Sequence, residues 1–433
     1  MSLYKNVFWK IIITSLICIP TRADDWPQWR GPSRDGIWSE KGIVKRFDTE
    51  QLPVRWRTII SNGYSGPTVA NGRVYITDRL ATPVQIERVH CFDAITGEKV
   101  WSHDYECIYE RIDHRNGPRA AVTINENRAY SLGAMGHMFC FDAANGNVLW
   151  NRDLQKEYKI RMPVWGIVAS PLIEERLVIV LIGGENACLV AFDKVNGKEV
   201  WRALSDSAGY SAPIVIEQAG KRVLVCWTGE RVVGLNPLTG KLYWQHPFPP
   251  FRMIHNIATP VFQNNFIFVS GFFDGSLLLK VHPEKLAVEK VWQRRGPNER
   301  NTDSLHCCIS TPILQGDYIY GVDSYGELRC LDLYTGDRIW ESLLAVPNAR
   351  WANIQMVRHE ERIWMFNERG ELIISKLSPK GYHEISRAKL INPTQGQLNQ
   401  RGGVCWAHPA FAYKHIYIRN DEELICADLS SKD

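Results

Sequence analysis

Short apolar stretches separated by turn residues run through most of the chain. Residues 68–77 (Thr-Val-Ala-Asn-Gly-Arg-Val-Tyr-Ile-Thr) place an Asn-Gly pair between two such stretches, which is the signal of a tight β-hairpin. Residues 313–322 repeat the arrangement with Gln315-Gly316-Asp317 at the turn. The pattern predicts short antiparallel strands, and its recurrence calls for a search for longer repeats.

A longer motif recurs along the chain and ends in tryptophan. It runs from a small residue through Asp or Asn, Thr or Asn, and Gly to a Trp ten positions after its start. Its five clear copies are CFDAITGEKVW (91–101), CFDAANGNVLW (140–150), AFDKVNGKEVW (191–201), GLNPLTGKLYW (234–244) and CLDLYTGDRIW (330–340). With Trp56 and Trp292 added, the motif tryptophans recur every 43 to 51 residues.

The motif describes a turn that leads into a strand. The Asp side chain bonds backbone groups across the turn, the Gly supplies a positive φ, and the Trp offers a large packing face. Because the turn already explains the Asp residues of the motif, they are poor candidates for catalysis. Two strands precede each copy, so each unit holds four strands, as in a blade of a β-propeller.

Two units depart from the template, and the last is incomplete. Residues 280–292 keep the Trp but lack the Gly, which predicts that Trp292 contributes less to stability than Trp101. Residues 375–385 keep the Gly and end in Ile385. The unit at 407–429 has three strands, whereas residues 54–58 carry Trp56 with no unit before them. We therefore expect the strand at Trp56 to complete the last blade, which leaves no open sheet edge.

The predicted fold is all-β, a closed eight-bladed β-propeller of four-stranded blades that occupies residues 54–433. The first strands of the blades are expected to begin near Pro67, Val122, Pro171, Pro213, Pro260, Pro312, Gln355 and Pro409.

Residues 1–23 do not fit the repeat. A basic start, an apolar run over 11–19 and Thr21-Arg22-Ala23 before Asp24 are typical of a cleaved signal peptide. This predicts export to the periplasm or the extracellular space, a leader over 24–53, and no transmembrane segment. A retained N-terminal anchor and a lipid anchor at Cys18 are the alternatives.

The composition is that of a soluble globular protein. Of 433 residues, 45% are hydrophobic and 23% charged, which excludes a disordered chain, a coiled coil and a polytopic membrane protein. Removal of residues 1–23 takes away Lys5, Lys10 and Arg22 and lowers the formal net charge from +4 to +1. We therefore expect no nucleic-acid partner.

The motif, the eight units and the closure resemble the quinoprotein-like β-propellers, the PQQ-like repeat family, over residues 54–429. The opening Asp25-Trp26-Pro27-Gln28-Trp29-Arg30-Gly31-Pro32 is similar to the leader of a large group of secreted bacterial proteins of that kind. For that group the resemblance implies a fold and an export route, and no established activity.

The residues before the eight first strands are the candidates for ligand binding, because these strands line the channel of a propeller. They are Tyr64, Arg119, Trp165, Tyr210, His255, His306, Trp351 and Trp406, and the adjoining loops add Arg111, His114, Arg115, Arg161, Arg252 and Asp303. Arg, His and aromatic side chains together suit an anionic or ring-shaped ligand. The alternative is a solvated rim with aromatic side chains that fill the channel.

Cys307 and Cys308 are adjacent and can form a strained vicinal disulfide, which the resemblance to quinoprotein alcohol dehydrogenases would place against a quinone. The alternative is two unlinked cysteines, one in the blade core and one in the channel. Asp303 is a weak candidate for a general base. Gly183-Gly184-Glu185 resembles the turn that provides a calcium-ligating Glu in quinoprotein dehydrogenases, so the resemblance makes Glu185 a candidate calcium ligand, and a solvated hairpin turn is the alternative.

Two functions remain open at this point. The first is an exported, non-catalytic binding or scaffold propeller that takes a small anionic molecule, a glycan or a protein at the channel mouth. The second is a dehydrogenase of alcohols or sugars that depends on pyrroloquinoline quinone (PQQ) and calcium.

Overall fold

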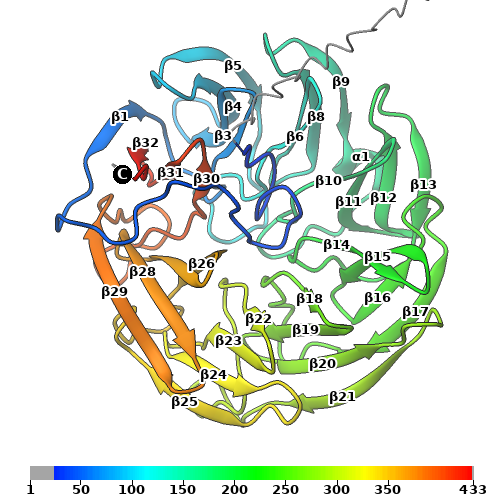
Figure 1. The fold of residues 1–433 in the computed structure, drawn as a ribbon. Helices are drawn as coiled ribbons and strands as arrows, with labels where there is room; N and C mark the ends of the chain where they lie inside the picture. The colour runs from blue at the N-terminus through cyan, green and yellow to red at the C-terminus, as the bar shows by residue number, and fades with distance from the viewer. Residues whose placement is uncertain (1–23, 432–433) are drawn as a thin grey trace, which may run out of the picture.

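The protein is a ring of eight antiparallel sheets of four strands each, and the computed structural model describes residues 24–431 (Figure 1). In seven sheets the four strands follow one another in sequence from the channel outward. One short helix, α1 (Leu154–Tyr158), is found within the described residues. This arrangement confirms the predicted eight-bladed propeller.

Four concentric sets of strands make up the ring. The innermost set is β2 (Thr68–Ala70), β6 (Thr123–Asn125), β10 (Leu172–Glu174), β14 (Ile214–Gln218), β18 (Val261–Gln263), β22 (Ile313–Gln315), β26 (Ile354–His359) and β30 (Ala410–Ala412). The second set is β3 (Arg73–Leu80), β7 (Arg128–Leu132), β11 (Leu177–Gly184), β15 (Lys221–Trp227), β19 (Phe266–Gly271), β23 (Tyr318–Val322), β27 (Arg362–Asn367) and β31 (His415–Arg419). Each innermost strand begins within one residue of the position expected from the sequence.

The two outer sets complete the blades. The third set is β4 (Ile86–Asp93), β8 (His137–Asp142), β12 (Ala187–Asp193), β16 (Arg231–Leu235), β20 (Gly275–Val281), β24 (Leu328–Asp332), β28 (Glu371–Ser378) and β32 (Glu423–Asp428). The outermost set is β5 (Lys99–Glu106), β9 (Val148–Asp153), β13 (Glu199–Ala203), β17 (Leu242–Pro247), β21 (Val288–Arg294), β25 (Arg338–Ser342), β29 (Gly381–Lys389) and β1 (Val54–Ile59).

The ring closes as the sequence predicts. Strand β1 pairs antiparallel with β32, and Trp56 lies opposite Cys426. The eighth blade therefore joins the N-terminal strand to the last three strands, which removes an open edge from the ring.

Each motif tryptophan packs on the blade that follows its own. A Cβ added to Gly146, in the turn of the second blade, would lie 2.6 Å from the Trp101 ring of the first, so the ring sits directly on the glycine. The indole N–H of Trp101 also donates to the carbonyl of Ala143 in that turn, at 3.0 Å. Gly97, Gly197, Gly240 and Gly336 contact Trp56, Trp150, Trp201 and Trp292 in the same way. The motif is thus a contact between neighbouring blades.

This geometry corrects the expectation for Trp292. Its partner is Gly336 of the sixth blade, and its indole N–H donates to Leu333 O at 2.8 Å, so its packing is complete. The blade that lacks the glycine is the partner of Trp244. There Gln218 substitutes, because its side-chain oxygen accepts the Trp244 N–H at 2.8 Å and its amide donates to three carbonyls of the fifth-blade turn.

The leader crosses the ring on one side (Figure 1). Trp26 pairs with Val69 of the first blade and Ile37 with Arg358 of the seventh. Between them Arg34 is buried, and its guanidinium donates to the carbonyls of Ser170 and Pro171 in the third blade. Trp26 and Trp38 are each 2% exposed within the core beside the closing blade. Parts of the leader are therefore buried against the blades.

The contact between blades predicts how tryptophan substitutions rank. We expect Trp292→Ala to lower the free energy of unfolding by about 3 to 5 kcal/mol, as much as Trp101→Ala, since both rings rest on a glycine of the next blade. Gln218→Leu should cost about 1 to 3 kcal/mol because it leaves the Trp244 N–H and the turn carbonyls without partners. Urea unfolding measures these losses, and a loss for Trp292→Ala below half that of Trp101→Ala would contradict the assignment.

Candidate ligand-binding site at the channel mouth

Segments from all eight blades surround one cavity of about 320 Å³ at an end of the central channel. Each segment precedes the innermost strand of its blade, so the ring itself brings residues distant in sequence together. One lining residue from each blade, in chain order, is Tyr64, Arg119, Trp165, Tyr210, His255, Cys308, Trp351 and Trp406.

The leader supplies part of the inner wall. Trp29 lines the cavity, and its indole N–H donates to the Thr259 hydroxyl at 2.8 Å. Its ring meets that of His408 edge-on, with centroids 4.6 Å apart. The channel is thus narrowed from within by a residue that lies outside the repeat.

Aromatic rings form most of the remaining wall and pack on one another. Trp165 lies 4.9 Å from Tyr210 and 4.9 Å from His255, measured between ring centroids. The Trp406 indole N–H donates to the carboxylate of Glu368, which also pairs with Arg401. These contacts fix the wall before any ligand enters.

Two guanidinium groups face the cavity, and no lining residue is an Asp or a Glu. Arg119 donates to the carbonyls of Asp113 and Gly117 and lies over the Tyr64 ring, with its Cζ 5.0 Å from the centroid. Carbonyls accept three of its hydrogen bonds but do not neutralise its charge. Arg350 pairs with Glu299 at 2.9 Å and lies 4.5 Å over the Trp351 ring. The cavity is therefore aromatic and positively charged.

Burial keeps the histidines of the cavity neutral. It lowers the pKa of His255 and of His408 to about 4. Burial and the neighbouring Arg119 lower the pKa of His114 as well. Burial raises the pKa of Tyr64 and of Tyr210 to about 12, so both hydroxyls stay protonated. At neutral pH the two arginines alone carry charge on this wall.

Nine of the predicted binding residues line this cavity, namely Tyr64, His114, Arg119, Trp165, Tyr210, His255, Cys308, Trp351 and Trp406. Arg252 does not line it. Its side chain is 56% exposed and lies 3.8 Å from Glu299, the carboxylate that also pairs with Arg350. Arg252 is therefore a neighbour of the site outside its wall.

His306 and Cys307 are directed into the protein interior. The His306 ring accepts the Gly296 N–H at Nε2 and donates from Nδ1 to Phe272 O at 3.0 Å, which makes it a neutral structural histidine. Cys307 packs in the core between the fifth and sixth blades. Both cysteines of the pair are free thiols in a loop before β22, so the unlinked alternative is the one observed.

The two weak candidates lie away from the cavity. Asp303 forms an ion pair with Arg294 of the outermost strand β21 at 2.8 Å, which directs its carboxylate outward. Glu185 is exposed in the hairpin turn between β11 and β12. Within residues 24–431, no three His, Cys, Asp or Glu side chains lie close enough together to hold a metal ion.

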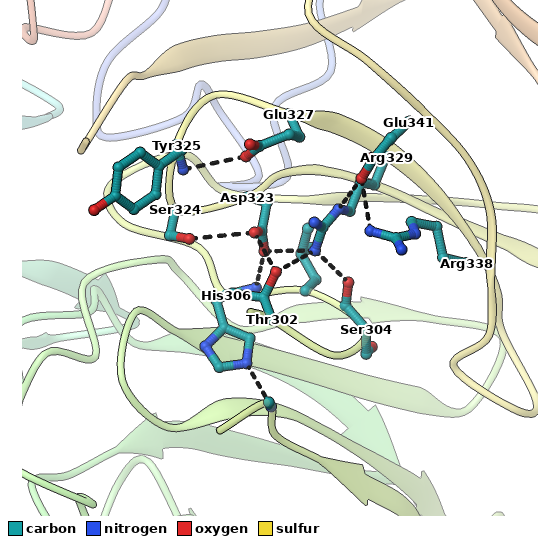
Figure 2. A network of polar contacts seen from close by, with 12 residues as sticks. Thr302, Ser304, His306, Asp323, Ser324, Tyr325, Glu327, Arg329, Arg338 and Glu341 are labelled. Atoms are coloured by element: carbon teal, nitrogen blue, oxygen red, sulfur yellow. Dashed lines mark hydrogen bonds and ion pairs between the residues drawn. The ribbon is translucent and has the colours of Figure 1, made fainter. Parts of the chain in front are cut away.

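A buried network holds the loop that carries Cys308 (Figure 2). Asp323 is 2% exposed and accepts the backbone N–H of His306 at 2.6 Å and the Thr302 hydroxyl at 2.7 Å. Arg329 joins this carboxylate to Glu341 on β25. Similar pairs, Asp206 with Arg231 and Asp78 with Arg88, hold loops of other blades. These carboxylates support the mouth and do not face the cavity.

Sequence reasoning missed several lining residues. Arg350 precedes the predicted Trp351, and its charge beside an aromatic could have identified it. Phe273 and Met253 lie in loops that carry no repeat signal. Trp29 was not predicted because the path of the leader cannot be read from the repeats.

A family model described as "Outer membrane protein assembly factor BamB" (PQQ_2) matches residues 85–342, more than half of the chain. The chain belongs to this family of PQQ-like β-propellers. The outer membrane protein assembly factor BamB of Shewanella oneidensis is 26% identical over 164 residues. That match covers 37% of this chain and 40% of the relative, so it spans less than half of the relative's length.

Two solved structures share the PQQ-like fold. BamB from Moraxella catarrhalis has a TM-score of 0.60 at 15% identity, over 88% of this chain and 99% of its own. The quinohemoprotein alcohol dehydrogenase from Comamonas testosteroni has a TM-score of 0.61 at 12% identity, over 94% of this chain and 81% of its own. At these identities the likeness establishes the fold alone.

The dehydrogenase alternative requires PQQ and calcium, and the cavity wall suits PQQ better than calcium. Aromatic walls and two arginines suit a flat ring that bears carboxylates, as PQQ does. Calcium prefers six to eight oxygen ligands, and the wall has no carboxylate to offer. Separately, no helix within residues 24–431 has the length and apolarity needed to cross a membrane.

Acid should destabilise the propeller through His255 and His408. Because the folded-state pKa of each is about 4 against an ordinary 6.5, the unfolded chain binds protons between pH 6.5 and 4 that the folded chain does not. Stability is complete above about pH 6.5 and falls as the pH drops, by roughly 3 kcal/mol per imidazole at pH 4.

Urea unfolding at pH 7 and pH 4 measures this loss. His408→Gln should lose roughly 3 kcal/mol less than the wild type between the two pH values. An equal loss in both proteins would show that His408 is not held neutral by burial.

Proposed function

We propose that the protein is an exported, non-catalytic binding propeller whose channel mouth takes a flat anionic small molecule. The observation that carries the proposal is the composition of the cavity wall, which combines aromatic faces and two guanidinium groups with no carboxylate. Stacking would hold a ring, and charge-assisted hydrogen bonds would hold its anionic groups. The signal expected at residues 1–23, which lie outside the described residues, supports export.

The disposition of the carboxylates favours binding over oxidation. A dehydrogenase of alcohols needs a base that takes the substrate proton. The carboxylates of the mouth loops are held by partners behind the wall, as Asp323 is by Arg329 and Glu368 by Arg401. Asp303 faces outward. The wall therefore offers groups that can bind a ligand, and no carboxylate of the mouth loops is placed to act as the base.

A second candidate function is binding of a protein segment in the course of assembly. It is favoured by the family match and by the relative from Shewanella oneidensis, both described as an outer membrane protein assembly factor. A segment with an exposed carboxylate and an aromatic side chain would use the same wall. This function predicts that a peptide binds at the mouth more tightly than the small molecules do.

The test uses purified protein from residue 24 onward and two matched probes, naphthalene-2,6-dicarboxylate and its neutral dimethyl ester. Isothermal titration should show the dicarboxylate binding at least about tenfold more tightly, since each charge-assisted hydrogen bond contributes roughly 1.5 to 3 kcal/mol. Its affinity should fall as salt rises from 50 to 500 mM, because ions screen the arginines.

Charge variants locate the site. Arg119→Ala and Arg350→Ala should each weaken the dicarboxylate about 10- to 100-fold. The matched control is Arg338→Ala, whose side chain is 44% exposed on β25 and pairs with Glu341, and it should bind as the wild type does. Equal binding by Arg119→Ala and Arg338→Ala would refute the site. Alcohol-dependent dye reduction with added PQQ and calcium would refute the non-catalytic function.

A further inference from the structure

The cavity wall carries a cysteine–histidine contact that the proposed function does not use. Sγ of Cys308 lies 3.9 Å from Nε2 of His255. Both residues line the cavity and each is 5% exposed. They come from neighbouring blades, so the ring brings them together across 53 residues of sequence.

The imidazole is held in place by aromatic rings. His255 stacks on Phe272 at 5.0 Å and meets the edge of Phe273 at 5.6 Å and of Trp165 at 4.9 Å. Its Nδ1 is buried without a hydrogen-bond partner. With the proton on Nδ1, the lone pair of Nε2 is directed at the thiol. Packing thus fixes a nitrogen donor beside a sulfur donor.

A third soft donor belongs to the same segment. Met253 lines the cavity and lies two residues before His255. A thioether, an imidazole and a thiol on one wall match the preference of copper(I) for soft sulfur ligands, with imidazole nitrogen as a further donor. We propose that Cys308, His255 and Met253 bind a single copper(I) ion in the wall of the channel mouth.

The 3.9 Å separation of the sulfur and nitrogen donors favours a low coordination number. With metal–nitrogen and metal–sulfur bonds of about 2.0 and 2.3 Å, donors 3.9 Å apart subtend roughly 130° at the metal. That angle lies between trigonal and linear geometry and is wider than the tetrahedral angle that zinc adopts. A fourth ligand is also missing, because no three His, Cys, Asp or Glu side chains are grouped within residues 24–431.

The positive charge of the wall also favours copper(I) over a divalent metal ion. Binding forms a copper–sulfur bond and releases the thiol proton to solvent, so copper(I) and the thiolate together are neutral. A dication on the same ligands would add a positive charge to a wall that already carries Arg119 and Arg350 and no carboxylate.

The experiment titrates protein from residue 24 onward with copper(I) under anaerobic conditions, in competition with the indicator bicinchoninate. We expect one ion per chain. Loss of a supporting partner beyond the ligands costs about 10- to 100-fold in metal affinity, so loss of a ligand in Cys308→Ser should cost at least about 100-fold. Met253→Leu should weaken binding less, since a thioether is the weakest of the three donors.

Two controls separate this site from other thiols and from the anion site. Cys307→Ser removes the adjacent buried thiol that does not line the cavity, and Arg119→Ala removes the anion contact; both should retain wild-type copper affinity. Failure of the anion proposal would therefore leave this one intact. Equal losses in Cys307→Ser and Cys308→Ser, or displacement of copper(I) by equimolar zinc, would overturn the assignment.

A measurement on the wild-type protein tests the site even if the variants do not fold. Silver(I), a redox-inert substitute for copper(I), should shift the Nε2 resonance of one histidine in protein labelled with ¹⁵N-histidine. His255→Gln should abolish that shifted signal. No shift of any histidine resonance on addition of one equivalent of silver would also overturn the proposal.

Discussion

The packing of five motif tryptophans, Trp56, Trp101, Trp150, Trp201 and Trp292, on the glycine turn of the next blade is the contact on which the ring depends. It joins neighbouring blades and fixes their spacing, because the indole ring occupies the space where a Cβ would stand on the glycine. The indole N–H adds a hydrogen bond to the same turn, as from Trp101 to Ala143. Since the turn bends the chain back toward the channel mouth, the contact also sets where the next mouth segment begins.

Ring closure accounts for the exception at the seventh blade. The eighth blade takes its outer strand from the N-terminus, so no chain turn links β32 to β1. The seventh blade therefore has no glycine turn to pack against, and it carries Ile385 in place of a tryptophan, packed against the closing core. The turn of the fifth blade lacks the glycine, and Gln218 of the fourth blade supplies polar contacts to that turn and to Trp244 instead. The seventh blade thus lacks its tryptophan because the blade that follows it offers no glycine turn.

The sequence predicted the fold in detail because the repeat encodes it through local turn chemistry and a fixed period. It located the channel mouth for the same reason, since the segment before each inner strand must face the axis. It failed where side-chain direction depends on tertiary contacts. Asp303 turns outward to Arg294, and His306 turns inward to Phe272 O. Trp29 lines the cavity, but it belongs to the leader, whose path no repeat describes. The packing of Trp292 was predicted wrongly because its glycine partner lies in the next blade.

The charge of the mouth follows from how its loops are held. Most buried ions near it are paired, as Asp323 is with Arg329, so their fields largely cancel. Arg119 differs because three carbonyls accept its hydrogen bonds, which leaves two of its five donors free and its charge uncompensated beside low-dielectric aromatic walls. Neutral imidazoles add nothing to that charge. The wall consequently attracts an anion at the arginines. It tolerates a metal ion only where the protein supplies a negative ligand, as the Cys308 thiolate would for copper(I). Both expectations therefore rest on the same absence of carboxylates from the lining.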